Sequence, residues 1–413
     1  MRSGRNLRID GQRLWDSLMA MAEIGATAKG GSKRLALSDL DKAGRDLFVR
    51  WCKEAGCTVT VDRMGNIFAR RAGRRADLPP IVTGSHLDTQ PTGGKFDGVY
   101  GVLAGLEVVR ALNDGAYETD APIEVVVWTN EEGARFAPAM VASGVFAGVF
   151  SEEYGHSRAD ADGKTMGEEL RRIGYLGEAP VGGRPLRAYF EAHIEQGPIL
   201  EAEGKTIGVV QGIQGIRWFE ATLTGSESHA GTTPMNRRHD ALLGAARLID
   251  RINRIALDHP PGVATVGIIE ARPGSRNTIP GSVFLTVDLR HPEDAALTTM
   301  KSALEAAIAT LSRDLGLTAA CQEIWWSPAI HFNEAAIGAV RNAAAALGYG
   351  HRDIVSGAGH DAAYVNRVAP TAMIFVPCAD GLSHNEVESA TPADLAAGCN
   401  VLLHAILEHA APP

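Results

Sequence analysis

The chain has 413 residues, of which 45% are hydrophobic, with 40 lysines and arginines against 49 aspartates and glutamates and a net charge of −9. This length predicts two or three domains with a substantial core, which excludes disorder as the main state. The acidic balance argues against nucleic acid as a partner, because binding to phosphates needs clustered positive charge.

The cysteines and apolar segments indicate the compartment. The five cysteines are scattered and show no C-x-x-C spacing, which favours a reducing environment over a disulfide framework. The longest uncharged apolar stretch, residues 136–150, is shorter than the roughly 20 residues that a membrane-spanning helix needs. We therefore expect a cytoplasmic protein without a membrane partner.

The first part of the chain alternates between strand and helix patterns. Ser38 and Asp41 resemble a capping box at the start of a helix that runs to about Glu54. An amphipathic helix is predicted over 98–113. Strands are predicted over 58–61, 66–70, 81–83, 123–128 and 187–194. Strands that alternate with helices favour a three-layer α/β domain.

The pattern changes in the middle of the chain. The order there is β-α-β-β-α-β, typical of a small ferredoxin-like α+β unit. Its strands are predicted over 217–224, 263–270, 283–290 and 318–326, and its helices over 237–257 and 292–315. A strand over 371–376 and a helix over 393–408 return to the α/β pattern. The predicted layout is a three-layer α/β domain over 1–212 and 327–413, interrupted by an inserted α+β domain over 213–326.

Histidines and carboxylates gather at or near the predicted strand ends of the α/β domain, where open sheets of this kind bind their ligands. They are His86, Asp88, Asp97, Glu131, Glu132, His193 and His384. This mixed imidazole and carboxylate set suits zinc, manganese, cobalt or nickel. The spacing alone leaves open which of the adjacent Glu131 and Glu132 would be a metal ligand and which a general base.

Seven segments in chain order carry a resemblance to a known family. They are GSHLDT, GGKFDGVYG, NEEG, EAHIEQGP, SHAGTTPM, GHDAA and GLSHNE. Together they resemble the di-metal aminoacylase/carboxypeptidase superfamily, and more narrowly its hydantoinase/carbamoylase branch. That branch includes N-carbamoyl-L-amino acid hydrolases, β-ureidopropionases and allantoate amidohydrolases. The H-I-E-Q-G pattern around His193 selects the branch, because many peptidase and aminoacylase relatives have a carboxylate there.

The resemblance implies two divalent metal ions per subunit, with zinc expected first and manganese, cobalt or nickel as alternatives. Asp97 would bridge the two ions. His86 and His193 would complete one site, and Glu132 and His384 would complete the other.

The resemblance also implies the catalytic and substrate-binding residues. Glu131 would be the general base that activates a metal-bridging water, Asp88 would orient the ring of His86, and His229 would stabilise the oxyanion, often from the partner subunit. Arg290 would hold the carboxylate of the substrate. The full set of implied substrate contacts is Gln196, His229, Asn277, Arg290 and Gly359.

We therefore expect a homodimer, paired through the inserted lid domain, that cleaves the carbamoyl group of a small N-carbamoyl amino acid. The substrate would be an N-carbamoyl-L-amino acid or N-carbamoyl-β-alanine, and the products would be the amino acid, carbon dioxide and ammonia. Allantoate hydrolysis, and an aminoacylase or dipeptidase reaction at the same metal site, are the alternatives. One methylene group is worth only about 1–3 kcal/mol of discrimination in a pocket, so spacing does not choose the substrate.

Overall fold

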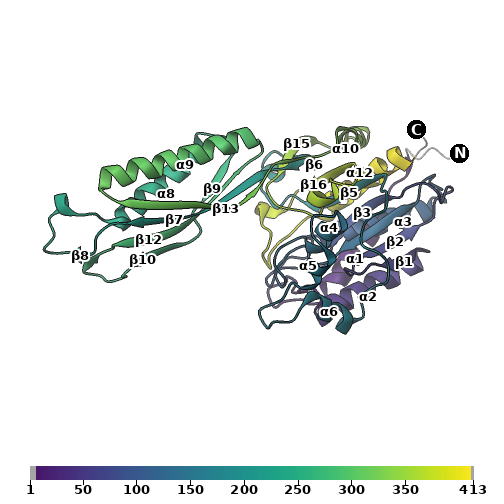
Figure 1. Cartoon of the computed structure of the whole chain (residues 1–413). Coiled ribbons are helices and arrows are strands. Elements are labelled where there is room, and N and C mark those ends of the chain that lie inside the picture. The colour runs from purple at the N-terminus through teal and green to yellow at the C-terminus, as the bar shows by residue number, and fades with distance from the viewer. Residues whose placement is uncertain (1–5, 411–413) are drawn as a thin grey trace. The chain divides into compact units, whose positions relative to one another are not determined.

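The computed structural model describes residues 6–410 and divides the chain into two compact units (Figure 1). The first unit combines the residues up to Gln211 with those from Phe332 onward, and the second unit is Gly212–His331. Within the described range, no helix has the length and hydropathy that a membrane span requires.

The first unit is built on one mixed sheet with the strand order β1-β2-β4-β3-β5-β16-β6, to which β15 adds by pairing with β6. The strands are β1 (Thr58–Val61), β2 (Ile67–Arg71), β3 (Ile81–His86), β4 (Ile123–Trp128), β5 (Ala188–Ile194), β6 (Ile207–Ile213), β15 (His351–Ser356) and β16 (Thr371–Val376). The central strands β4, β3, β5 and β16 are parallel to one another. All four are buried along their whole length, as expected of parallel strands covered on both faces.

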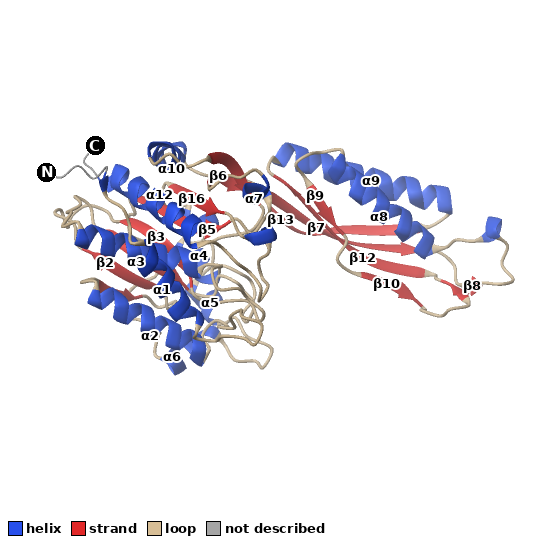
Figure 2. Cartoon of the chain, turned by 180° about the vertical axis from the view of Figure 1, so that it is seen from behind, coloured by secondary structure: helices blue, strands red, loops and turns tan. Residues whose placement is uncertain are grey.

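Helices pack around this sheet (Figure 2). They are α1 (Gly11–Ala22), α2 (Asp39–Glu54), α3 (Val99–Asp114), α4 (Val141–Phe146), α5 (Glu152–His156), α6 (Met166–Ile173), α7 (Ile199–Ala202), α10 (Glu334–Ala346), α11 (Ala362–Val365) and α12 (Pro392–Ala410), with the 3-10 turn η3 (Ala379–Gly381). Two glycines let α3 lie close to the sheet, since a Cβ at Gly101 would come within 2.4 Å of the carbonyl oxygen of Ala192 and one at Gly105 within 2.8 Å of Val125. The start of α3 is thereby held beside the ends of β3 and β5.

The second unit is an antiparallel sheet with the order β10-β12-β7-β13, in which β9 also pairs with β12. Its elements are β7 (Gly215–Thr224), β8 (Ser228–His229), η2 (Met235–Arg237), α8 (Ala241–Leu257), β9 (Val263–Thr265), β10 (Ile269–Arg272), β11 (Thr278–Ile279), β12 (Ser282–His291), α9 (Asp294–Leu315), β13 (Thr318–Ser327) and β14 (Ile330–His331). The helices α8 and α9 lie on one face of the sheet, where alternate strand residues such as Leu223 and Leu285 form the core with them. The predicted fold class, a layered α/β domain with a ferredoxin-like α+β insert, is confirmed.

Three local predictions need correction. The single strand predicted over 263–270 is wrong, because β9 and β10 are separate and the N–H of Ile268 between them bonds to the Thr286 hydroxyl, 3.2 Å away. The helix predicted from residue 237 begins at Ala241, where Asp240 caps two backbone N–H groups. Ser38 does cap α2, but the Asp41 carboxylate bonds to the N–H of Leu37 instead of returning to Ser38.

Candidate metal centre

The five predicted metal ligands come together at the carboxyl edge of the parallel strands. His86 is the last residue of β3, His193 is the last but one residue of β5, and Glu132 follows β4. Asp97 directly precedes Gly98, the N-cap of α3, and His384 follows β16 and η3. Parallel strands end at the same edge, so segments far apart in the sequence deliver their side chains to one place.

The first group of possible ligands is His86, Asp97 and His193, whose ligand atoms lie within 4.8 Å of one another. Nε2 of His193 is 3.2 Å from Oδ1 of Asp97, and Nε2 of His86 is 3.7 Å from the same oxygen. All three side chains are buried. A cation placed among them would have two imidazole nitrogens and one carboxylate oxygen as ligands.

The second group is Asp97, Glu132 and His384. Nε2 of His384 is 3.3 Å from Oδ2 of Asp97 and 3.4 Å from Oε2 of Glu132. Asp97 therefore uses one carboxylate oxygen toward each group. This geometry is the one expected of a carboxylate that bridges two cations.

The hydrogen bonds of His86 and His193 show that Nε2 is the ring nitrogen that faces Asp97. Nδ1–H of His86 donates to the carbonyl oxygen of Asp88 at 2.8 Å, and Nδ1–H of His193 donates to that of Ile194 at 2.9 Å. In the neutral ring the other nitrogen, Nε2, then carries a lone pair that can bind a metal ion. In the metal-free chain a proton lies at this position of His193, because the contact with Asp97 outweighs burial and raises the pKa of His193 to about 9. A metal ion would take the place of that proton, so the donor set fits a metal ion.

The pKa values of the buried carboxylates also indicate a cation site. Burial raises the pKa of Glu132 to about 8, with Asp97 adding to the effect, and burial raises the pKa of Asp88 to about 7. The pKa of Glu131 lies well above its usual value because of burial and the neighbouring Asp361 and Glu132. So many carboxylates in one buried place need positive charge, and divalent cations supply it.

Glu131 lies next to the first group of ligands. Its Oε2 is 3.4 Å from Nε2 of His86, and the side chain is buried. Glu132, its neighbour in sequence, belongs to the second group instead. The adjacent glutamates thus occupy different places in the centre, which spacing alone did not separate.

Asp88 holds two segments of the centre together. Its carbonyl oxygen accepts the bond from His86, whereas its carboxylate Oδ1 is 4.0 Å from that ring. The carboxylate instead accepts the backbone N–H groups of Glu131 and Glu132, at 3.3 and 3.2 Å. The contact of Asp88 with the His86 ring is therefore made through the main chain.

Gln196 lies at the edge of the second group. Its side-chain Nε2–H donates to Oδ2 of Asp97 and to the Ser383 hydroxyl, both at 3.0 Å. Among the described residues, no partner bonds to its buried Oε1, so this oxygen can accept a bond from a ligand. Gln196 and His384 both have left-handed backbones, with φ of +57° and +52°. Non-glycine residues in this conformation are strained, and such strain is concentrated at functional sites.

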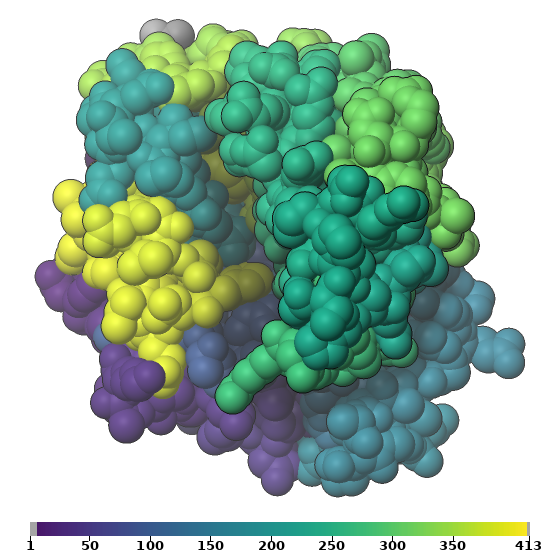
Figure 3. Space-filling model, turned by 90° about the vertical axis from the view of Figure 1, so that its left-hand side faces the viewer, coloured from purple at the N-terminus to yellow at the C-terminus, as the bar shows by residue number. Residues whose placement is uncertain are grey.

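The predicted substrate contacts divide between the two units. Gly359 lies in the first unit, where a Cβ on it would come within 3.0 Å of Met140. In the second unit, β8 and β11 pair His229 with Thr278, next to Asn277. Figure 3 shows the end of this unit that carries β8, in teal, facing the viewer. Arg290 lies near the opposite end of β12, where its Nε and Nη2 bond to the carboxylate of Asp288.

The turn after β8 determines the tautomer of His229. Nδ1 of this exposed ring accepts the backbone N–H groups of Gly231 and Thr232, at 3.0 and 3.2 Å. In the neutral ring the proton therefore sits on Nε2. His229 thus offers a hydrogen-bond donor, which is what stabilisation of an oxyanion requires.

Two polar residues of the centre were not predicted, Glu388 and Ser383, and both bond to the Asp97 segment. His360, which the sequence places in the loop of Gly359 and not among the ligands, forms a third possible ligand group with Glu191 and His193. For Glu388 the only sequence signal was its position four residues after His384. Its backbone partners, Phe96 and Asp97, lie 292 and 291 residues away along the chain, which no local pattern reveals.

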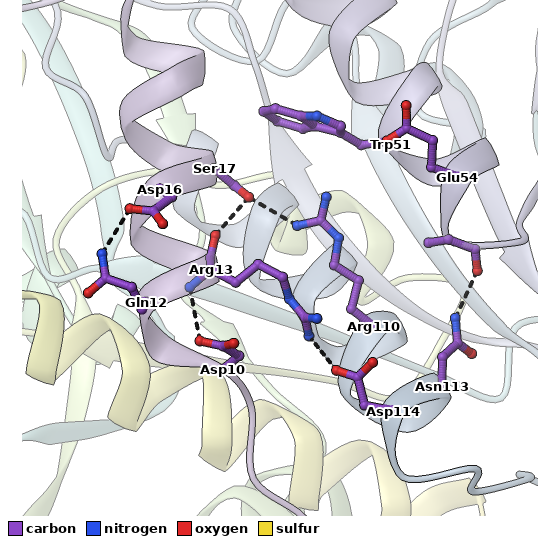
Figure 4. A pocket seen from close by; sticks show the side chains of 11 residues that line it. Asp10, Gln12, Arg13, Asp16, Ser17, Trp51, Glu54, Arg110, Asn113 and Asp114 are labelled. Carbon is purple, nitrogen blue, oxygen red and sulfur yellow. Dashed lines mark hydrogen bonds and ion pairs between the residues drawn. The ribbon is translucent and has the colours of Figure 1, made fainter.

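A cavity of about 630 Å³ lies elsewhere, among α1, α2 and α3 (Figure 4). Several of its charged groups have partners within the lining, since Arg13 pairs with Asp114 and Arg110 bonds to the Ser17 hydroxyl. Arg110 also lies over the ring of Trp51, at 5.7 Å. We therefore place the candidate functional site at the histidine and carboxylate cluster.

Comparison with known proteins agrees with this geometry. The profile of Peptidase family M20/M25/M40 matches residues 82–408, and the chain belongs to this family. Within it, an N-carbamoyl-L-amino-acid amidohydrolase of Rhizobium meliloti is 52% identical over 98% of this chain and 98% of its own length.

A crystal structure of an amidase of the hydantoinase/carbamoylase family from Burkholderia multivorans has a TM-score of 0.96 and 67% identity, covering 98% of this chain and 99% of that one. An allantoate amidohydrolase of Bacillus subtilis (strain 168) is 34% identical over 94% of this chain and 95% of its own length. The predicted resemblance to the hydantoinase/carbamoylase branch is confirmed.

Proposed function

We propose that the protein is a metal-dependent hydrolase that removes the carbamoyl group of N-carbamoyl-L-amino acids, releasing the amino acid, carbon dioxide and ammonia. It acts on carbon–nitrogen bonds other than peptide bonds, in linear amides. The observation that carries the proposal is the 52% identity, over 98% of the chain, to a relative named for this activity. The relative named for allantoate is 34% identical, which favours the N-carbamoyl amino acid over allantoate.

We assign two divalent ions to each subunit, with Asp97 between them. Zinc suits imidazole and carboxylate ligands well, and manganese, cobalt and nickel are also suitable. The support for two ions is that the two ligand groups share Asp97 and use its two oxygens separately. When bound, such ions polarise the substrate carbonyl and lower the pKa of a water molecule.

The residues of the chain would carry the proton and hold the developing charge. Glu131 takes a proton from the attacking water and returns it to the nitrogen that leaves the carbamoyl carbon first. The carbamic acid formed by this step then loses carbon dioxide, which breaks the second carbon–nitrogen bond and frees the other nitrogen. Nε2–H of His229 donates to the oxygen that gains negative charge on that carbon. Arg290 binds the substrate carboxylate, and Asn277, Gln196 and the Gly359 backbone complete the substrate contacts.

The test is ammonia release from N-carbamoyl-L-methionine, N-carbamoyl-β-alanine and allantoate, measured side by side with metal-loaded protein. We expect the fastest turnover with the N-carbamoyl-L-amino acid, with loss of activity on chelation and recovery when metal is restored. A preference for N-carbamoyl-β-alanine or allantoate would assign a different substrate to the same class of enzyme. Release from none of them by protein with two bound ions would favour an aminoacylase or dipeptidase instead.

We also propose a homodimer, paired through the second unit, in which His229 and Asn277 act in the partner's metal centre. The support is a distance along the sheet: Arg290 lies eight residues from Ser282 at the start of β12, which is roughly 27 Å in a strand. His229 and Asn277 lie beyond that start. One small substrate does not reach both ends of the unit, so the two sets would serve different active sites.

Mixing two inactive variants tests this arrangement. Glu131→Gln removes the proposed base, and His229→Ala removes the proposed oxyanion donor. If His229 acts on the partner, hybrid dimers contain one centre with both residues intact, and activity returns after subunit exchange. If no activity returns in dimers shown to be mixed, His229 acts within its own subunit. Sedimentation at the monomer mass would contradict the dimer itself.

A further inference from the structure

Glu388 is a buried carboxylate with no assigned part in the centre. Its residue is only 4% exposed, whereas glutamate normally lies at the surface. Oε1 accepts the backbone N–H groups of Phe96 and Asp97, at 2.9 and 3.1 Å. Oε2 accepts the Ser383 hydroxyl at 2.9 Å. Glu388 therefore joins the segment of Asp97 to the segment of His384.

Ser383 extends this connection to the side chain of Asp97. Its hydroxyl lies 3.1 Å from Oδ2 of Asp97 as well as 2.9 Å from Glu388, and it accepts the amide of Gln196. A hydroxyl has one proton, so it donates to one of the two carboxylates at a time. The three segments that carry Asp97, Gln196 and His384 thus meet at the pair Ser383–Glu388.

The surrounding backbone is shaped around the Glu388 side chain. A Cβ at Gly94 would lie 2.1 Å from the Glu388 carboxyl group, so any larger residue at position 94 would displace it. His384, next to Ser383, has a left-handed backbone. Such a conformation persists only where its surroundings hold it, and the bonds of Ser383 and Glu388 hold both sides of this turn.

We infer that Glu388 is a positioning residue, which sets the distance between Asp97 and His384 by accepting hydrogen bonds from both of their segments. The inference rests on the proposed metal role of these two ligands. It goes further because it makes metal affinity depend on a carboxylate that belongs to neither ligand group. Residues that orient metal ligands typically change metal affinity by about 10–100-fold when they are removed.

The experiment compares Glu388→Ala, Glu388→Gln and the matched control Glu386→Ala. Glu386 lies in the same segment, and its carboxylate is 3.7 Å from the ammonium group of Lys29. Zn²⁺ or Co²⁺ alone is titrated into metal-free protein, and the number of bound ions, the Kd and the Co²⁺ absorption spectrum are recorded. No substrate is needed, so the readout does not depend on which reaction the enzyme catalyses.

We expect Glu388→Ala to weaken binding of at least one ion by about 10–100-fold and to alter the Co²⁺ spectrum. Glu388→Gln keeps an oxygen for the two N–H groups and an amide toward Ser383, so it should restore binding close to wild type. Glu386→Ala should have no effect. Wild-type affinity and spectrum in Glu388→Ala, or an equal loss in Glu386→Ala, would overturn the inference.

Two further variants keep the test decisive if Glu388→Ala does not fold. Gly94→Ala pushes the carboxylate aside without removing it, and Ser383→Ala removes the hydroxyl that both carboxylates share. Each should weaken metal binding, and unchanged binding in both would also overturn the inference. If wild-type protein itself binds no metal, the proposed function fails, which is a separate result.

Discussion

A single methyl group at Gly98 should disable the metal centre. This glycine is the N-cap of α3, has a φ of +67°, and lies against His86. A Cβ built on it would be 2.3 Å from Cε1 and Nε2 of that ring, and its backbone N–H donates to Nε2 of His193 at 3.2 Å. Gly98→Ala therefore acts on two proposed ligands of the same ion.

The size of the effect follows from the distances. An ordinary contact begins at 3.4 Å, so the His86 ring would have to retreat by about 1 Å, several times the roughly 0.2 Å over which metal–ligand distances vary. The conformation of Gly98, with φ +67° and ψ −47°, costs a non-glycine residue about 1–3 kcal/mol, and overpacking a buried site costs about 1–3 kcal/mol more. We expect about 2–6 kcal/mol of lost stability together with loss of one bound ion.

Gly183→Ala is the matched control for this prediction. Gly183 has nearly the same φ, +70°, but a Cβ on it would meet nothing within 4 Å. It should therefore show the cost of a positive φ alone and retain both ions. Metal content and denaturant unfolding of both variants make the comparison. If Gly98→Ala keeps two ions and wild-type turnover, the reasoning about His86 is refuted.

Three further predictions concern charge. Glu131→Gln should keep both ions and lower kcat by about 10²–10⁴-fold, the usual contribution of a general base, and near-normal turnover would contradict that role. In metal-free protein, the raised pKa of Glu132, about 8, means that the folded state binds more protons than the unfolded chain between about pH 4.5 and 8. The free energy of unfolding should therefore fall as pH rises through this window, and denaturant titrations in chelator that show it rising would exclude the effect. Arg45→Ala should lose about 3–5 kcal/mol, because it leaves the fully buried Asp41 unpaired, whereas Arg254→Ala, in an exposed pair of the same i,i+4 spacing, should lose at most about 0.5 kcal/mol. Equal losses in the last two variants would contradict the burial argument.

The parts of the fold that the sequence predicted are those that local pattern determines. The strand over 123–128 is an apolar run with turn residues on both sides, and the structure places it at Ile123–Trp128. The prediction for 263–270 failed because the pairing with β12 is interrupted between β9 and β10, where the N–H of Ile268 bonds to the side chain of Thr286 instead of a backbone carbonyl. A run of β-prone residues does not show where pairing is interrupted, since the interruption depends on the neighbouring strand.

In the candidate site, too, some residues could be predicted from the sequence and others could not. His86, Glu132 and His384 could be placed near one another because strand ends converge in a parallel sheet. Glu388 could not, because its burial results from the Asp97 segment folding over it. The sequence also does not show which group of Asp88 contacts the ring of His86. In the structure the carbonyl oxygen of Asp88 accepts the bond from that ring, and its carboxylate accepts the backbone N–H groups of Glu131 and Glu132.

The hydrogen bonds around Asp97 hold several of the proposed ligands in fixed positions. Two ring nitrogens that face Asp97 have their other nitrogens committed to carbonyl oxygens, so these rings do not turn away without breaking a buried bond. The backbone N–H of Asp97 is likewise committed to Glu388. His86, His193 and Asp97 are therefore held in place by the chain itself, beside several buried carboxylates. A divalent cation would offset the negative charge of those carboxylates, so the contacts that hold these three ligands also favour metal binding.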